Sequence, residues 1–183
     1  IIKYLQKCAD IVITGRTTDT GLTLAPMIYE FGWKNTDFDL LSAGTVTGHI
    51  LECGGQSSGG NFLGDWQSIP NLAEIGFPIA EAYPNGEVII TKHYNTGGRV
   101  SFETVAEQLL YEIGDPKSYI TPDCVADFTS IKLEDLGNDR VKMHDVKGFP
   151  ETEFYKVSCS YSDGFSAVSS LTYSWPQALT KAR

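Results

Sequence analysis

The chain has 183 residues, of which 42% are apolar and 20% are charged, so it is long enough and apolar enough to form a globular domain. Its formal net charge is −9, and its 14 basic residues form no run. We therefore expect neither nucleic acid nor an anionic membrane surface as a partner, because both attract clustered Lys and Arg. No apolar stretch approaches the about 20 residues that span a bilayer.

The first eight residues, 1–8, are too polar for the apolar core of a signal peptide and lack an initiator Met. We expect the chain to begin inside a longer protein. The four cysteines are far apart in sequence and show no C-x-x-C spacing: Cys8, Cys53, Cys124 and Cys159. This usage, with no Asn-x-Ser/Thr acceptor, favours a reduced, cytoplasmic protein without structural zinc.

The beginning of the chain has the pattern of a strand, a loop and a helix. Residues 9–15 are a short apolar run that ends on Gly, which is typical of a buried strand. A polar loop over residues 16–20 follows, and residues 22–31 have helical spacing before Gly32. Such a unit is the building block of a mostly parallel sheet, in which ligands lie beyond the carboxyl ends of the strands. Arg16 and Asp19 are therefore candidate ligand contacts.

A second helix is predicted from Asp37 to Glu52. Gly44 and Gly48 weaken it by about 1 kcal/mol each relative to Ala, but they permit another backbone to approach closely. Its expected core contacts are Leu40, Leu41, Ala43, Val46, Ile50 and Leu51. The helix runs into a Gly-rich stretch over residues 53–61 that cannot be regular structure.

The remainder of the chain is predicted from turn and capping residues. Two extended runs, 78–82 and 87–91, flank Asn85-Gly86 and predict a hairpin. Ser101 is a good N-cap for an amphipathic helix that ends at Gly114. Beyond it, extended runs at 125–131, 140–143, 153–161 and 165–173 are separated by turns at 137–139 and 162–164.

These patterns predict an α/β fold: a mostly parallel sheet with flanking helices at the start and a β-rich antiparallel portion at the end. Residues 1–122 would form the α/β core, continuing from a missing N-terminal half. Residues 123–183 would be either part of the same domain or a small appended subdomain.

Reactive side chains are concentrated at the end of the second predicted helix. His49 and Cys53 lie four residues apart on one helical face, where they could act as base and thiolate nucleophile. His49 and Glu52 could instead form a general acid–base pair. The alternative is structural: Cys53 is a small core residue, and His49 hydrogen-bonds a backbone carbonyl.

Two glycine-rich segments could bind a phosphate or carboxylate through backbone N–H groups. The first contains Gly54, Gly55, Ser57, Ser58, Gly59, Gly60 and Asn61, and the second contains Thr96, Gly97, Gly98 and Arg99. Arg16 and Arg99 are candidate clamps for such an anion. Asp19 could act as a base, hold Arg16 or cap the following helix. A tightly turned connector is the equal alternative for the first segment.

No P-loop and no G-x-G-x-x-G string occurs, and no ligand set for a metal is evident, so we expect neither cofactor nor metal.

Seven ordered strings resemble the acyclic terpene utilisation (AtuA-like) family. They lie at residues 9–19, 24–26, 30–33, 43–54, 76–81, 96–98 and 107–116. The resemblance implies a protein about twice this length or more, associated with the microbial breakdown of acyclic terpenes such as citronellol and geraniol, alongside enzymes of branched acyl-CoA thioesters. It supplies a pathway context and no reaction.

Two functions are compatible with these features. The first is an enzyme that acts on a branched, carboxylated or CoA-linked acyl substrate by lyase, hydratase or hydrolase chemistry. The second is a non-catalytic ligand-binding or assembly subunit of an acyl-processing complex. Either would bind a small acyl or acyl-CoA ligand, and we expect a homo-oligomer or a complex with another chain.

Overall fold

The structure is a computed structural model that describes residues 1–155, 157, 159–173, 175 and 178–183. The helices are α1 (Ile2–Leu5), α2 (Gly21–Phe31), α3 (Phe38–Leu51), α4 (Phe102–Leu110) and α5 (Ala178–Ala182). The strands are β1 (Pro78–Ala82), β2 (Val88–Lys92), β3 (Tyr119–Ile120), β4 (Val125–Asp127), β5 (Lys132–Asp135), β6 (Val141–His144) and β7 (Lys147–Phe149).

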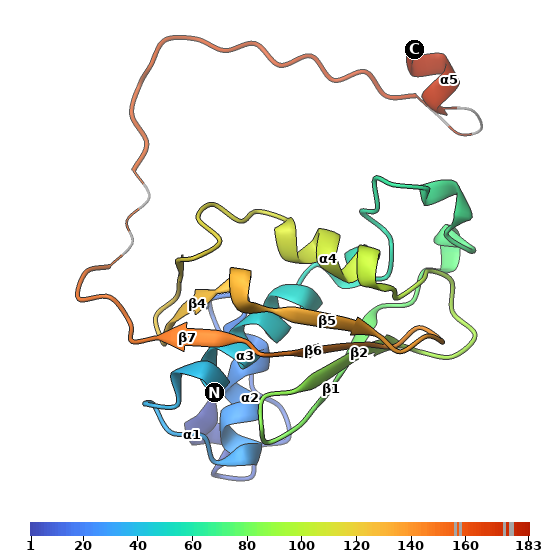
Figure 1. The fold of residues 1–183 in the computed structure, drawn as a ribbon. Coiled ribbons are helices and arrows are strands. Elements are labelled where there is room, and N and C mark those ends of the chain that lie inside the picture. Colours follow the sequence, from blue (N-terminus) through green and yellow to red (C-terminus); the bar gives the residue numbers. More distant parts are fainter. Residues whose placement is uncertain (156, 158, 174, 176–177) are drawn as a thin grey trace.

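Helix α3 is the centre of the fold. All its residues from Leu41 to Ile50 are buried, and it contacts α2, α4 and strands of both sheets (Figure 1). A helix buried on all sides needs apolar or small residues around its whole circumference. The sequence of α3 meets that need with Gly44 and Gly48, which let neighbouring elements approach.

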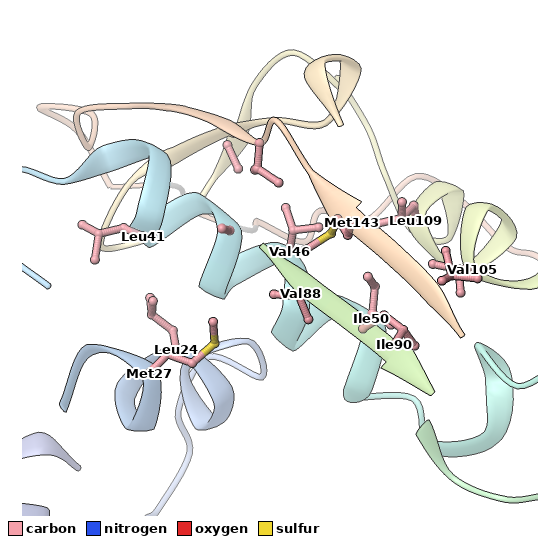
Figure 2. Close-up of a cluster of buried hydrophobic side chains, with 14 of the residues drawn as sticks. Leu24, Met27, Leu41, Val46, Ile50, Val88, Ile90, Val105, Leu109 and Met143 are labelled. Atoms are coloured by element: carbon pink, nitrogen blue, oxygen red, sulfur yellow. The ribbon is translucent and has the colours of Figure 1, made fainter. Parts of the chain in front are cut away.

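The larger sheet covers α3 on one side, in the strand order β1-β2-β6-β5. Val88 and Ile90 alternate with more exposed residues along β2, as expected for a strand with one buried face. Figure 2 shows these two side chains close to Val46 and Ile50 of α3 and to Met143 of β6. This contact region is the hydrophobic core.

The smaller sheet has the order β3-β4-β7. Every named strand pair in both sheets is antiparallel, so the prediction of a mostly parallel sheet is wrong. Within the described residues, parallel pairing is limited to one isolated bridge between Ile75 and Gly97. The physical reason lies in the connections. Tight turns join β1 to β2 and β5 to β6, whereas parallel neighbours need a crossover of a dozen residues or more.

The predicted strand over residues 9–15 is also wrong. The segment is irregular, and Ile11 and Ile13 are 80% and 92% exposed. A continuous apolar run becomes a buried strand only where neighbouring strands and covering layers exist, and the described chain offers this run none. The extended runs at 153–161 and 165–173 likewise join no sheet among the described residues; Lys156 and Ser158 lie outside them.

The main predicted helices and the hairpin are confirmed. Gly32 ends α2 in the left-handed conformation, and Ser101 forms a capping box with Thr104 at the start of α4. Helix α4 ends at Leu110, earlier than expected. Strands β2 and β6 pair across the predicted boundary at residue 122, so one sheet contains strands from both proposed portions. None of the helices described has the length and apolar character to cross a membrane.

Candidate functional site

A cleft of about 470 Å³ lies between the start of α2, the end of α3 and the residues that follow α4. Its lining residues are Asp19, Leu22, Thr23, Gly48, Leu51, Glu52, Cys53, Tyr111 and Glu112. Three of the four predicted catalytic residues, Asp19, Glu52 and Cys53, therefore share one cleft. The fourth, His49, is buried and reaches the cleft through Glu52.

His49 and Glu52 form a hydrogen-bonded pair whose geometry requires a shared proton. His49 Nε2 lies 2.9 Å from the backbone oxygen of Gln108, and Nδ1 lies 3.1 Å from Glu52 Oε1. Because a carbonyl only accepts, Nε2 carries a hydrogen. The contact between Nδ1 and the carboxyl group then needs a second proton, held by either partner. The Glu52 side chain is 16% exposed and gives this pair access to the cleft.

The His49 ring is fixed from several directions. Tyr119 and Phe128 flank it, with ring centroids at 5.9 and 5.6 Å. Gln108 completes a reciprocal contact, because its side-chain Nε2 donates to the backbone oxygen of His49 at 3.0 Å. Gln108 is buried, and its Oε1 has no hydrogen-bond partner among the described residues. His49 therefore makes both of the expected contacts. It bonds a backbone carbonyl, as a structural histidine would, and it also pairs with Glu52.

Cys53 is surrounded by acidic groups and not by a base. Burial is the largest cause and raises the pKa of its thiol, and a hydrogen bond to the Gln108 amide acts in the opposite direction. The negative charges of Glu52, Glu112 and Asp19 each raise the pKa by a smaller amount. In the described chain, no hydrogen bond joins Cys53 to His49. The arrangement therefore favours the neutral thiol and not the thiolate.

The pKa values of two nearby tyrosines are also raised in part by carboxylate charges. The charge of Glu112 raises the pKa of Tyr111, with smaller contributions from burial and from Cys53. Burial raises the pKa of Tyr119, followed by the charge of Glu52. The charge of Glu112 raises the pKa of all three groups, the Cys53 thiol and the two phenols, so the cleft disfavours a further negative charge.

The two glycine-rich segments pack against each other. Gly54 and Gly55 belong to the 3₁₀ turn η1 (Gly54–Gln56), and Thr96 Oγ1 donates to the backbone oxygen of His93 at 2.7 Å. The backbone N–H groups of Ser58, Gly59, Gly60, Gly97, Gly98 and Arg99 all donate to backbone oxygens of the protein. These donors are therefore occupied, as the connector alternative expects.

The contact between the segments is close enough to require glycine. Gly98 has φ of 84°, and a Cβ there would lie 2.7 Å from the backbone oxygen of Ser58. Ser57 and Ser58 are fully buried, and their hydroxyls have no partner among the described residues. Neither serine lines the cleft, and Asn61 lies outside it as well.

The predicted anion clamps do not reach the cleft. Arg99 donates to Ser68 Oγ at 3.1 Å and lies over the ring of Phe62. Arg16 is exposed, and the described residues offer it no ion pair. Asp19 does not cap α2, whose N-cap is Thr20 without a side-chain bond.

Sequence reasoning missed the contribution to the cleft of α4 and of the residues directly after it: Gln108 orients His49, and Tyr111 and Glu112 line the cleft. Gln108, Tyr111 and Glu112 lie in one of the strings that carry the family resemblance, but nothing in their spacing places them beside Cys53. A polar Gln108 at a core-facing position of an amphipathic helix was the available indication, because a buried amide needs partners.

The described residues contain no group of three or more His, Cys, Asp or Glu side chains placed to hold a metal ion. No curated protein and no solved structure matches the chain significantly. The profile of one family, described as acyclic terpene utilisation family protein AtuA, matches residues 1–183. The chain therefore belongs to the AtuA family of acyclic terpene utilisation.

Proposed function

We propose that this chain supplies the general acid–base site of an enzyme acting on a branched acyl substrate, by lyase or hydratase chemistry. Membership of the family implies a role in acyclic terpene utilisation. The observation that carries the proposal is the Glu52 carboxyl group in the cleft, bonded to a buried His49 whose other nitrogen is held by Gln108.

Glu52 is the group that exchanges a proton with the substrate, and His49 is its positioning residue. In the dehydration direction, Glu52 gives its proton to a hydroxyl oxygen, the C–O bond breaks, and water leaves. Asp19, the other predicted catalytic carboxylate of the cleft, accepts the proton lost from the neighbouring carbon, and the double bond forms. Hydration is the reverse. Such a positioned acid or base accelerates a reaction by about 10²–10⁴.

The charge of the cleft restricts what can bind beside Glu52. Three carboxyl groups line it, those of Asp19, Glu52 and Glu112, and no Lys or Arg does. A protonated oxygen or a carbon with developing positive charge is stabilised there, whereas an enolate or thiolate is destabilised. The reacting group is therefore neutral, and a carboxylate or CoA moiety lies away from Glu52. We propose no nucleophilic role for Cys53.

The test begins with binding to the full-length protein. A thermal-shift screen uses branched acyl-CoA thioesters, their free acids and acyclic alcohols. A ligand present at 100 times its Kd adds about 2.7 kcal/mol to the stability of the protein. The compounds that bind are then assayed for turnover. We expect Glu52→Gln to lower kcat by about 10²–10⁴.

Glu112→Gln makes the same substitution on the same cleft and is the matched control, with an expected loss below about tenfold. An unchanged kcat in Glu52→Gln would show that the proposed role is wrong. Equal losses in the two variants would assign the effect to the charge of the cleft and not to proton transfer.

The alternative function, a ligand-binding or assembly subunit, has one observation in its favour. Tyr161, Phe165, Val168 and Leu171 are all strongly exposed along a segment that leads away from the sheets (Figure 1). Exposed apolar side chains of this density mark association surfaces. Light scattering on the full-length protein and on a form ending at residue 158 tests it. An assembly that dissociates on truncation, without turnover, supports the alternative; a monomer that converts substrate rules it out.

A further inference from the structure

A second hollow of about 470 Å³ adjoins the acidic cleft along the outer face of α4. Its lining residues are Asn61, Leu63, Glu103, Ala106, Glu107, Leu110 and Tyr111, and its exposed surface is mostly apolar. Tyr111 lines both hollows, so they are neighbours on the surface. We call this hollow the α4 groove.

The α4 groove is built by specific contacts. The residues of α4 that line it are spaced at i, i+3, i+4 and i+7, which is one face of a helix. The other wall is fixed by Glu107, whose two carboxylate oxygens accept from the backbone N–H of Leu63 at 3.0 and 3.1 Å. The Glu103 carboxylate accepts from the hydroxyl of Ser101 at 2.8 Å.

The exposed walls of the groove are apolar. Leu63 is 85% exposed and Leu110 is 75% exposed, one on each side. The two acidic residues of the groove, Glu103 and Glu107, hydrogen-bond to the protein itself and keep their negative charges, and the apolar surface lies between the two leucines. Two linked hollows of this size have the dimensions of a small-molecule site, which commonly combines a few polar groups with apolar walls.

We propose that the α4 groove binds the hydrocarbon tail of the ligand whose reacting group lies at Glu52, with Tyr111 at the junction. The inference rests on the proposed function, because it takes the acidic cleft as the place of the reacting group. The part of the ligand that the groove binds is an extended, uncharged hydrocarbon chain attached to the neutral reacting group. A tail with a charged end near Glu103 or Glu107 is disfavoured.

Calorimetric titration of the full-length protein with n-butanol, n-hexanol and n-octanol tests the groove. A fully buried methylene group is worth about fourfold in affinity, and an open groove buries it in part. We expect Kd to fall about two- to fourfold for each added methylene group. Leu63→Ser and Leu110→Ser should both reduce this dependence on chain length.

Leu136→Ser is the matched control, because it makes the same substitution at an exposed leucine outside the groove. It should leave the chain-length dependence unchanged. If the wild-type Kd does not vary with chain length, the groove does not bind the tail. The same conclusion follows if both groove variants retain the dependence of Kd on chain length.

The two proposals fail separately. Glu52→Gln keeps the groove and removes the proton donor, so it should retain the chain-length dependence while turnover falls. If turnover persists in Glu52→Gln and the chain-length dependence remains, the acid–base role is wrong and the groove stands. If turnover falls in Glu52→Gln but Kd does not depend on chain length in wild type or in any variant, the proposal for the groove is wrong and the acid–base role stands.

Discussion

Gly48 is the position where a single methyl group should disturb both the fold and the cleft. It lies on α3 where the backbone of Thr20 crosses the helix. A Cβ at residue 48 would lie 2.6 Å from both Cα and O of Thr20, and 3.0 Å from its carbonyl carbon. These are backbone atoms of a buried residue, so no side-chain rotation can relieve the contact.

The expected magnitude follows from two opposing effects. Gly48→Ala gains about 1 kcal/mol of helix propensity. Overpacking costs about 1–3 kcal/mol, and the upper end applies here because α2 must move as a unit. The free energy of unfolding should therefore fall by about 1–2 kcal/mol. Because Thr20 follows Asp19, the same movement displaces one wall of the cleft and should weaken ligand binding.

Gly44→Ala is the matched control on the same helix. The nearest atom to a Cβ there is Cδ1 of Leu24, at 2.6 Å, followed by Cζ3 of Trp33 at 3.3 Å. The end of a leucine side chain can change rotamer, so the packing cost should be close to the gain in helix propensity. The free energy of unfolding of Gly44→Ala should therefore stay within about 1 kcal/mol of wild type. Urea unfolding measures both variants. If Gly48→Ala is as stable as Gly44→Ala, the close approach of α2 to α3 is not the constraint described.

Two further predictions follow from the pKa directions. Because burial and the neighbouring carboxylates raise the pKa of Cys53, iodoacetamide should alkylate it more slowly than free cysteine at pH 8, in a protein with Cys8 and Cys159 replaced by serine; faster alkylation would refute the negative cleft. Arg140 lowers the pKa of Glu81 by hydrogen bonding, so this pair stabilises the fold above the usual carboxyl pKa and loses that effect as pH falls through the lower folded-state pKa. In chemical unfolding, the free energy of unfolding of wild type should exceed that of Glu81→Gln by up to about 1 kcal/mol at pH 7 and should equal it at pH 2. A difference that stays constant with pH would contradict the assignment.

The elements predicted correctly are those specified by local residues. Helix α2 is bounded by Gly32, and α4 begins at Ser101, whose hydroxyl accepts from the N–H of Thr104. The hairpin follows from Asn85-Gly86, where Gly86 has φ of 83°. In each case the residues that decide the structure are within a few positions of the element itself.

The parallel sheet was predicted wrongly because strand pairing depends on distant residues. The run at 9–15 has the composition of a buried strand, but composition does not specify a partner. Strand β2 pairs with β6, and the partner of Val88 is Met143. The residues next to Val88 and Met143 do not predict that pairing. The residues next to 9–15 likewise do not predict that this run has no partner strand in the described chain.

The candidate site divides in the same way. His49, Glu52 and Cys53 come from one helix end, so their spacing brings them near one another. The spacing does not decide which pair forms, and the hydrogen bond joins His49 to Glu52. The Gln108 carbonyl that orients the ring lies 59 residues away in sequence. That contact depends on how α4 packs against α3, which no local pattern contains.

Helix α4 links the acid–base pair to the α4 groove. Its inner face carries Gln108, which exchanges hydrogen bonds with His49, and its outer face ends at Leu110 beside Tyr111. The distance between Glu52 and the two leucines therefore depends on how α4 packs against α3 and on the Glu107 carboxylate that holds the backbone of Leu63. The two proposals together predict that the site selects ligands by the length of chain between a neutral reacting group and the tail. In these proposals the cleft restricts the charge of the reacting group, and the groove restricts the tail.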